Sequence, residues 1–277
     1  MTVGVQGKRV LVTGGAGFLG SRLVRTLLEK KCKVRVLDTR YGELEGEKAR
    51  RNLEFVGIGH EELHGGIADS RLVRSAMKGV EIVYHLAINW DGHTWKHRIP
   101  LADLFDVNIR GTLNLLEAAS LQKVRHLMFA SSAALYGETF QTLSRKGRLA
   151  NASPAGEKST CLPELWKGDP GPAYGILKLA TEKLCLMYYH QHALPVTAFR
   201  IEYVFEGQAE FSDYANIHVD DVVAAFLLST LNKRAYGQVF NVAYPSPHIS
   251  VAKLQRVMGW KPLRTREMLR KFRIEKE

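Results

Sequence analysis

Two kinds of hydrophobic pattern alternate along this chain. Short apolar runs that end at glycine or polar residues predict buried strands. These runs are Arg9–Thr13, Lys33–Leu37, Glu81–Leu86, His126–Ala130 and Val196–Ile201. Between them, apolar residues recur every three or four positions, which predicts amphipathic helices. These segments are Phe18–Lys30, Arg71–Lys78, a stretch ending near Leu121, Tyr174–His190 and Asp220–Leu231. Strands that alternate with helices favour a doubly wound parallel sheet of the α/β class, with helices on both faces.

Two stretches lack this patterning. Residues 40–52 are charged and poor in apolar residues, which indicates a loop, and residues 141–172 are rich in Gly, Pro, Ser and Lys. The second stretch predicts a long surface excursion rather than core. We find no internal repeat and no linker that would mark a second independent domain.

Composition narrows the class of protein. The chain has 277 residues, of which 45% are hydrophobic, enough to bury one large core. A disordered chain, a disulfide miniprotein and a fibrous repeat are therefore excluded. The net charge of +11 would attract phosphates, acidic substrates, nucleic acid or anionic membranes, although a simply basic surface accounts for it equally well.

Cysteine usage and the termini predict a cytoplasmic location. Cys32, Cys161 and Cys185 are odd in number and widely spaced, so they form neither a zinc pattern nor a disulfide framework. The N-terminus has no apolar signal-peptide core, and the longest apolar stretch, near 222–231, is too short to span a bilayer. No membrane partner is expected.

The first candidate site is a glycine turn between the first strand and the first helix. Residues 13–20 read TGGAGFLG, and Asp38 ends the next strand about 20 residues further on, which is the dinucleotide-binding pattern. The glycines would let the backbone approach a pyrophosphate, and the helix N-terminus would attract its charge. Asp38 would accept from ribose hydroxyls and repel a 2′-phosphate, which favours NAD over NADP, although Arg40 lies nearby. The alternative is a structural turn beside an exposed aspartate.

The second candidate site combines a serine, a tyrosine and a lysine. Tyr174 and Lys178 lie one helical turn apart on one face, and Ser131-Ser132 ends a strand at the sheet edge where such folds bind ligands. Removing hydride from a carbinol requires a base for the hydroxyl proton, and a lysine charge about 5 Å away would lower the pKa of a tyrosine by contributing about 3 kcal/mol. The structural alternatives are a strand-end hydroxyl for Ser132 and a solvated pair for the other two.

With these two sites, the chain resembles the extended branch of the short-chain dehydrogenase/reductase superfamily, the NAD-dependent epimerases and dehydratases. The matching segments run in family order: TGGAGFLG (13–20), Asp38, HLA (85–87), NIRGTLNLLEAA (108–119), SSAALYG (131–137), YGILK (174–178), HVDDV (218–222) and GQVFNVA (237–243). The resemblance implies a Rossmann-type fold. It places the catalytic serine at Ser132, the tyrosine base at Tyr174, the lysine at Lys178 and the helix asparagine at Asn108, which could instead only cap its helix.

The resemblance also implies the residues that would hold NAD. They are Gly14, Gly17, Phe18, Leu19, Gly20, Asp38, Ile67, Asp69, Ala87, Tyr174 and Lys178. The acidic residue that contacts adenine in the family aligns with Gly66 here. No metal is expected: His93 and His97 have i,i+4 spacing but no third ligand. Trp90 and Trp95 could stack on a sugar or simply pack, and His218 is expected to anchor a helix start.

Two further departures from the family concern the substrate. In RIEYVFEG (200–207), Tyr203 and Glu206 replace the usual asparagine and glycine, and Glu206 would repel a diphosphate. Only about ten residues then precede HVDDV, so the substrate lobe is expected to be shortened. The resemblance therefore predicts an NAD-binding domain with the catalytic residues over 1–200, and a small C-terminal substrate lobe over 201–277 that is interleaved with the main domain.

Three functions remain open. The first is an NAD-dependent dehydrogenase that oxidises a carbinol of a small sugar or sugar acid once. The second is a nucleotide-sugar 4-epimerase or dehydratase that keeps its NAD, with the basic residues of 141–172 as a lid. The third, a non-catalytic nucleic-acid-binding relative, is motivated by the charge but not by an intact serine, tyrosine and lysine. Relatives often dimerise through helices that correspond to 101–121 and 173–190, so a homodimer is an added expectation.

Overall fold

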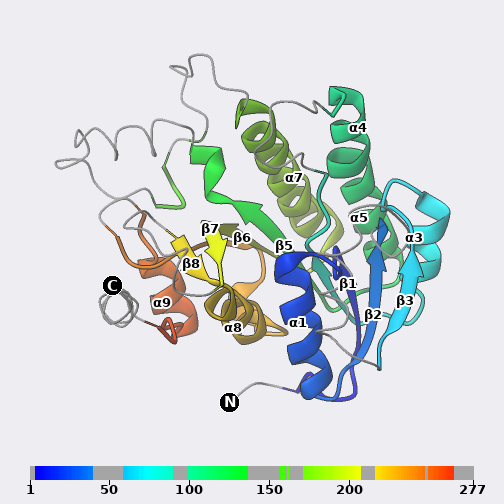
Figure 1. Ribbon diagram of the computed structural model, residues 1–277, viewed down its shortest axis with the longest axis horizontal. Helices are drawn as coiled ribbons and strands as arrows, with labels where there is room; N and C mark the ends of the chain where they lie inside the picture. Colours follow the sequence, from blue (N-terminus) through cyan, green and yellow to red (C-terminus); the bar gives the residue numbers. More distant parts are fainter. Residues whose placement is uncertain are drawn as a thin grey trace, which may run out of the picture.

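The computed structural model describes residues 4–39, 59–89, 99–136, 156–159, 161, 171–206, 216–246 and 249–264 (Figure 1). Its centre is a seven-stranded sheet in the order β3-β2-β1-β4-β5-β6-β9, and each neighbouring pair of strands is parallel. The strands are β1 (Arg9–Thr13), β2 (Lys33–Asp38), β3 (Glu61–His64), β4 (Ile82–His85), β5 (His126–Ser132), β6 (Val196–Ile201) and β9 (Gln238–Val242). The predicted α/β class and parallel sheet are confirmed.

Helices cover both faces of this sheet. One face carries α1 (Phe18–Glu29), α8 (Val219–Ser229) and α9 (Ala252–Met258), and the other carries α3 (Ser70–Ala76), α5 (Gly111–Leu121) and α7 (Gly171–His192). Two separate hydrophobic clusters fill the two interfaces. Each strand of the middle of the sheet is buried on both faces, which explains why it reads as a continuous apolar run.

Shorter elements complete the fold. Helix α4 (Leu101–Phe105) continues through a π-helical turn, η2 (Asp106–Arg110), into α5. Two 3₁₀ turns, η3 (Ala133–Tyr136) and η4 (Lys233–Ala235), follow β5 and α8. A separate parallel pair, β7 (Tyr203–Phe205) and β8 (Asn216–His218), lies next to α8 and follows directly from the end of β6. Strand β9, which comes from the C-terminal part of the chain, belongs to the central sheet.

Strand order identifies the ligand-binding edge. From β1 the chain moves outward through β2 and β3, and then returns to build β4, β5, β6 and β9 on the other side. The order therefore reverses between β1 and β4. In open parallel sheets ligands bind beyond the carboxyl ends of the strands at such a reversal. Thr13 and His85, the last residues of these two strands, are partners in register there.

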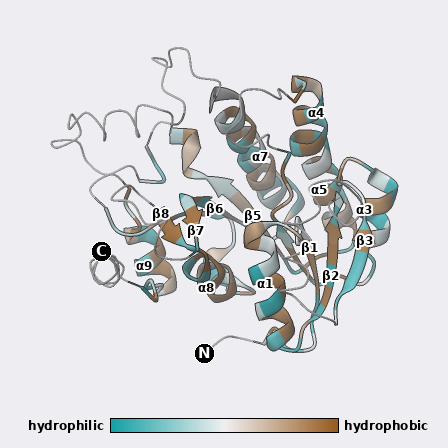
Figure 2. Cartoon of the chain, viewed as in Figure 1, coloured by the Kyte–Doolittle hydropathy of each residue, from teal (hydrophilic) through white to brown (hydrophobic). Residues whose placement is uncertain are grey.

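The edge strand β3 was not predicted, and its sequence shows why. Its residues Glu61–His64 are mostly exposed, so it lacks the apolar run that marks the buried strands. Figure 2 shows β3 in hydrophilic colours beside the hydrophobic β1 and β2. The predicted loop 40–52 and most of the predicted excursion 141–172 lie outside the described residues.

Candidate active site

The glycine turn closes tightly against the start of α1. A Cβ atom on Gly20 would lie 2.1 Å from the Gly14 carbonyl oxygen, and one on Gly14, whose φ is +73°, would lie 2.7 Å from the Ala87 nitrogen. These positions accept only glycine because the crowding atoms belong to the backbone. Helix α1 begins after Gly17 without a side-chain cap. The N–H groups of Phe18 and Leu19 thus stand in the first turn of a helix, where they have no intrahelical acceptor.

Asp38 is tied to this turn. Its carboxylate is 7% exposed and accepts a hydrogen bond of 2.9 Å from the Ala16 N–H. The end of β2 therefore holds the loop between β1 and α1 in shape. Six of the residues predicted to hold a dinucleotide thus come together at one end of the sheet, and Ala87, two residues after the end of β4, lies against Gly14. The six are Gly14, Gly17, Phe18, Leu19, Gly20 and Asp38.

The two residues predicted near adenine have local structural roles. Ile67 is buried against Gly111 at the start of α5. Asp69 is the N-cap of α3 and accepts from the backbone of Arg71 and Leu72, and these two hydrogen bonds hold its pKa below the usual range. A contact of either residue with adenine stays a prediction.

Ser132, Tyr174 and Lys178 meet beyond the carboxyl end of β5. The Ser132 hydroxyl is hydrogen-bonded to Tyr174 and also accepts from the Ala134 N–H at 3.1 Å. The Lys178 ammonium donates to the Ala130 carbonyl at 2.6 Å and lies 5.7 Å from the centre of the Tyr174 ring. The three groups predicted from separate segments therefore form one cluster, as they must in order to act on one substrate atom.

Burial dominates the acid–base behaviour of this cluster. It raises the pKa of Tyr174, and the Ser132 hydrogen bond opposes that shift. Burial also lowers the pKa of Lys178 to about 7. The sequence argument expects a fully charged lysine that lowers the tyrosine pKa. The structure differs, because the lysine itself is desolvated and carries its full charge only below neutral pH.

Asn108 does not cap a helix. It lies in the π-helical turn η2, and its side-chain amide donates to the Asn89 carbonyl and accepts from the Asn89 N–H, both at 3.0 Å. It thereby fixes the backbone that follows β4. Its own carbonyl accepts from the hydroxyls of Thr112 and Thr181, which join α5 and α7 to the same turn.

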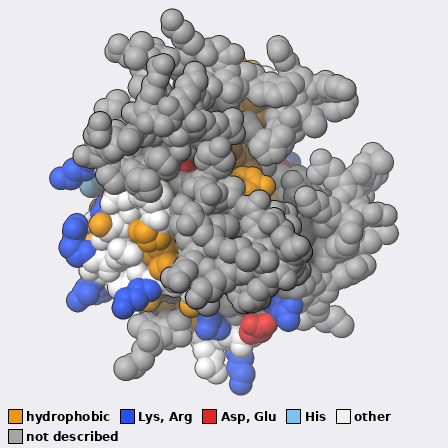
Figure 3. Space-filling model, turned by 60° about the vertical axis from the view of Figure 1, so that its left-hand side comes forward, with side chains coloured by type: hydrophobic (Ala, Val, Ile, Leu, Met, Phe, Trp, Pro, Cys, Tyr) orange, Lys and Arg blue, Asp and Glu red, His pale blue; other side chains and the backbone are white. Residues whose placement is uncertain are grey.

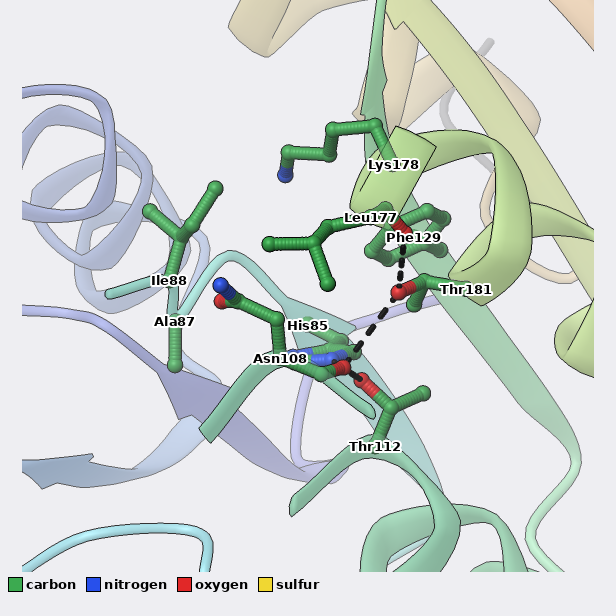
Figure 4. A pocket seen from close by; sticks show the side chains of 9 residues that line it. All are labelled: His85, Ala87, Ile88, Asn108, Thr112, Phe129, Leu177, Lys178 and Thr181. Carbon is green, nitrogen blue, oxygen red and sulfur yellow. Dashed lines mark hydrogen bonds between the residues drawn. The ribbon is translucent and has the colours of Figure 1, made fainter. Parts of the chain in front are cut away.

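A cavity lies among these elements (Figure 4). It has about 200 Å³ of space, part of which is open to solvent. Its lining comes from the end of β4 and the segment after it, from the middle of β5, from η2 and α5, and from α7. It comprises His85, Ala87, Ile88, Asn108, Thr112, Phe129, Leu177, Lys178 and Thr181. Predicted catalytic and cofactor residues therefore border one hollow at the edge where the strand order reverses.

His85 was quoted only as part of a motif, and the structure gives it a specific position. Its Nδ1 lies 2.9 Å from the Thr13 hydroxyl and its Nε2 lies 2.9 Å from the Thr112 hydroxyl. Thr112 gives its only hydroxyl proton to the Asn108 carbonyl, so the Nε2–H of His85 must donate to Thr112. Burial, reinforced by the Lys178 charge, lowers the pKa of His85 to about 3, so the ring is neutral at physiological pH.

Two acidic residues of the RIEYVFEG segment also have defined surroundings. Glu206 pairs with Arg22 of α1, whose Nε lies 3.1 Å from the carboxylate, so its charge is compensated. The repulsion of a diphosphate by Glu206 stays a prediction, and this pairing would weaken it. Glu202 follows β6 next to the strand of Ser132, and burial raises its pKa to about 7. Sequence reasoning gave Glu202 no role, and its position directly after a buried strand is the signal that was available.

Several expectations can be placed only in part. His93, His97, Trp90 and Trp95 lie outside the described residues. His218 caps α8 by accepting from the Asp220 N–H, which confirms the expected anchor. Within the described part of the chain, no group of His, Cys, Asp and Glu could hold a metal ion, and no helix is long and apolar enough to cross a membrane.

Fold and site together define a class: a dinucleotide-binding α/β protein with a serine, tyrosine and lysine at the ligand edge of its sheet. The family comparison is more specific. Residues 10–211 match the model of the NAD dependent epimerase/dehydratase family, and the chain belongs to that family. This confirms the resemblance inferred from the sequence.

Relatives of known description are similar at about 30% identity. A UDP-N-acetyl-alpha-D-glucosaminuronate decarboxylase of Bacillus cytotoxicus is 30% identical over 218 residues, which cover 76% of this chain and 59% of the relative. A UDP-glucose 4-epimerase of Yersinia enterocolitica is 31% identical over 163 residues, which cover 57% and 47%. An uncharacterized UDP-glucose epimerase of Bacillus subtilis is 28% identical over 211 residues, which cover 71% and 57%. The chain thus spans about half to three fifths of their lengths.

Solved structures agree on the fold. A UDP-glucuronic acid 4-epimerase from Bacillus cereus, in complex with UDP-glucuronic acid and NAD, superimposes with a TM-score of 0.75 at 18% identity, covering 95% of this chain and 99% of that one. A mutated uronate dehydrogenase gives 0.71 at 23% identity, covering 98% and 86%. The epimerase Mth375 of Methanothermobacter thermautotrophicus gives 0.74 at 20% identity, covering 96% and 91%.

Proposed function

We propose that this protein is an NAD-dependent oxidoreductase that transfers hydride between a carbinol of a sugar and NAD. The observation that carries this proposal is the cluster of Ser132, Tyr174 and Lys178 beside the glycine turn. When bound, NAD supplies the hydride acceptor. The protein must then remove the hydroxyl proton, and the Tyr174 phenol oxygen is the group placed for this task, with Ser132 as hydrogen-bond partner of the substrate oxygen.

The glycine turn fits NAD. A pyrophosphate needs free N–H groups and space for its oxygens, and the uncapped first turn of α1 beside Gly14 and Gly20 offers both. Asp38 stands at the end of β2, where it could accept from the adenosine ribose hydroxyls and would repel a 2′-phosphate. This supports NAD rather than NADP as the cofactor.

Lys178 links the proton step to pH. With its ammonium 5.7 Å from the tyrosine ring, a charged lysine would favour the phenolate by about 3 kcal/mol at an effective dielectric constant near 20. Because burial brings the lysine pKa to about 7, this support is partial at neutral pH in the free protein. A ribose hydroxyl of the bound cofactor next to Lys178 would accept a hydrogen bond from the ammonium group. This bond would replace the lost hydration and so favour the charged form of Lys178.

Two substrate classes divide the proposal. A free sugar or sugar acid oxidised once is favoured by the expected shortened lobe. A nucleotide-linked sugar whose hydride is returned, as in an epimerase or dehydratase, is favoured by the printed names of the relatives and by the Arg22–Glu206 pair, which weakens one objection to a diphosphate. The epimerase class has gained the more support.

A homodimer and a cytoplasmic location remain part of the proposal. Leu101 and Phe105 of α4 and Ile176 of α7 are 58%, 47% and 47% exposed, and these large apolar side chains lie on the helices expected to pair. The three cysteines are free, which suits a reducing compartment. Light scattering coupled to gel filtration will give the molar mass and thus test the dimer.

The decisive experiment compares wild type with Tyr174→Phe. An epimerase or dehydratase would convert UDP-sugars without net accumulation of NADH, whereas a dehydrogenase would oxidise free sugars and accumulate NADH. Absorbance of NADH and analysis of the products therefore separate the two substrate classes. Tyr174→Phe should lose turnover by a factor of about 10² to 10⁴ while calorimetry shows nearly unchanged NAD affinity, because only the proton acceptor is removed. Tyr189→Phe, about four turns further along the same helix and away from the site, is the matched control. Full turnover by Tyr174→Phe would contradict the assignment.

A further inference from the structure

Basic side chains collect at the edge of the sheet opposite to the site. In a doubly wound fold, every loop that leads from a helix into a strand lies at the amino ends of the strands. The described segments at this edge are 7–9, 29–33, 59–61, 77–81, 121–125, 190–195 and 231–237. They carry ten basic residues: Lys8, Arg9, Lys30, Lys31, Lys33, Lys78, Lys123, Arg125, Lys233 and Arg234. Glu29, Glu61 and Glu81 are their three acidic residues, so the excess is seven positive charges out of the net +11.

These segments form one continuous surface. Backbone hydrogen bonds join them side by side: Lys33 donates to Lys8, Glu81 to Arg9, Arg125 to Glu81, and Gly237 to Val196. Lys30 and Lys31 end α1 on one face of the sheet, whereas Lys78 and Lys123 follow α3 and α5 on the other face. In Figure 1 the amino ends of the strands lie at the bottom, and in Figure 3 Lys and Arg side chains lie along this lower margin, with an acidic side chain between them. We name this surface the basic edge.

Helix dipoles account for only part of this charge. Helices α1, α3, α5, α7 and α8 all run antiparallel to the strands, so their carboxyl ends meet at the basic edge. Each carboxyl end carries about −0.5 of an elementary charge, which gives about two and a half negative charges for five helices. The Glu81 carboxylate pairs with Lys8 at 2.9 Å and with Arg125 at 3.4 Å, and its charge is one of the three acidic charges counted above. An excess of about four positive charges remains without an internal reason.

The chemistry of the basic edge selects its partner. Leu121, in the midst of these lysines, is 76% exposed, the most exposed large apolar side chain in the described part of the chain. An apolar side chain surrounded by lysines suits an interface between water and an anionic membrane. Single-stranded nucleic acid would favour exposed aromatic rings for stacking. The most exposed aromatic residues of the described part of the chain, Phe105 and Tyr203, lie away from this edge, and Tyr236 within the edge is half-buried.

We propose that the basic edge binds the surface of an anionic lipid bilayer, with Leu121 inserted at the headgroup level. The carboxyl edge of the sheet, with its glycine turn and Tyr174, then faces away from the membrane, so substrate and cofactor exchange freely with water. The binding is peripheral and reversible. It rests only on this surface and does not depend on the proposed function.

The test is sedimentation with vesicles. Wild type should sediment with vesicles of phosphatidylcholine and phosphatidylglycerol in equal parts at physiological ionic strength, stay in solution with phosphatidylcholine alone, and be released by high salt. The triple variant Lys33→Glu, Lys78→Glu, Lys233→Glu should bind roughly 100-fold more weakly or worse, because each basic residue near such a surface contributes about fivefold. Leu121→Ser should weaken binding by a smaller factor of about 10.

The control triple Arg71→Glu, Arg110→Glu, Lys183→Glu changes the net charge equally at exposed positions in the first turn of α3, at the end of η2 and in the middle of α7, away from this edge. It should keep most of the binding, and thermal unfolding should show that both triples fold. An equal loss in both triples would reduce the effect to net charge and overturn the proposal. Wild type that stays in solution with anionic vesicles would also overturn the proposal. So would binding of single-stranded RNA in a filter assay, if Leu121→Ser changes neither the binding to RNA nor the binding to vesicles.

Discussion

His85 and His126, at 1% and 0% exposure, are completely enclosed within the described part of the chain, and both are held neutral. His85 bridges the hydroxyls of Thr13 and Thr112, and His126 contacts the Thr197 hydroxyl at 2.8 Å and accepts from the Leu231 N–H at 3.1 Å. Burial lowers the pKa of each to about 3. A neutral ring with two satisfied nitrogens costs little to bury, whereas a charged ring would strain the network around it.

These histidines should make the fold sensitive to acid. Their folded pKa lies below the ordinary value, so the unfolded chain binds more protons between pH 6.5 and 3. The free energy of unfolding then falls with falling pH by about 1.4 kcal/mol per pH unit for each histidine in this window. Urea unfolding of His85→Gln and of His126→Gln should each show a slope reduced by about one proton relative to wild type. The exposed His190→Gln is the control, and equal slopes in all four proteins would contradict this account.

At the scale of single residues, the sequence predicted the site residues that belong to a motif with a defined chemical role. Ser132, Tyr174 and Lys178 were predicted from family order, and the structure brings them together. The sequence could not show that Lys178 is desolvated, because that depends on Phe129, whose ring lies 5.0 Å from the ammonium, and on packing of α7 over β5. It also could not pair Arg22 with Glu206, which are 184 positions apart.

Elements with a strong local signal agree closely with their prediction. Strand β6 was predicted within its observed bounds, and α1 ends one residue before the predicted end. The π-helical turn η2 was not predicted, and it joins α4 to α5 without a break in the helical backbone. Strands β7 and β8 have three residues each, too short for any periodicity to appear. Tertiary packing, rather than local pattern, determines these elements.

The connection between β1 and α1 is the element most intolerant of added volume. An alanine methyl at position 20 would overlap the Gly14 carbonyl oxygen and the Gly15 Cα, and neither backbone atom can move without shifting α1. We expect Gly20→Ala to lower the affinity for NAD by a factor of about 10 or more, because the helix N–H groups would be displaced from the pyrophosphate. Overpacking should also lower the stability by about 1 to 3 kcal/mol.

Calorimetric titration with NAD and thermal unfolding will measure both effects. Gly156→Ala is the matched control, because a Cβ at that position meets nothing within 4 Å and its φ is not in the left-handed region. A Gly20→Ala variant with the NAD affinity of wild type would show that the turn is not the cofactor site. Thermal unfolding of Gly20→Ala without NAD will show whether the variant folds. This separates a loss of NAD affinity caused by the altered turn from one caused by unfolding.

On the scale of the whole molecule, one buried polar network joins the sheet to its surroundings. Arg200 of β6 pairs with Glu182 of α7 through two hydrogen bonds of 2.7 and 3.0 Å, and both side chains are almost fully buried. Ser131 donates to the same carboxylate from β5. Arg200 also donates to Tyr136, whose hydroxyl reaches Asn241 of β9. Three adjacent strands and the helix that carries Tyr174 are thereby held in one arrangement.

This network predicts a strongly non-additive pair of substitutions. Arg200→Met should lower the free energy of unfolding by about 3 to 5 kcal/mol, because it leaves the Glu182 carboxylate buried without its cation. Adding Glu182→Leu should recover a large part of that loss, since no uncompensated charge then remains. Urea unfolding of the two single variants and the double variant will give the coupling free energy. The exposed i,i+4 pair Arg25 and Glu29 is the control, with an expected coupling of about 0.5 kcal/mol or less. If the double variant is no more stable than Arg200→Met, the pair does not act as a unit, and the orientation of α7 over the sheet must depend on apolar packing alone.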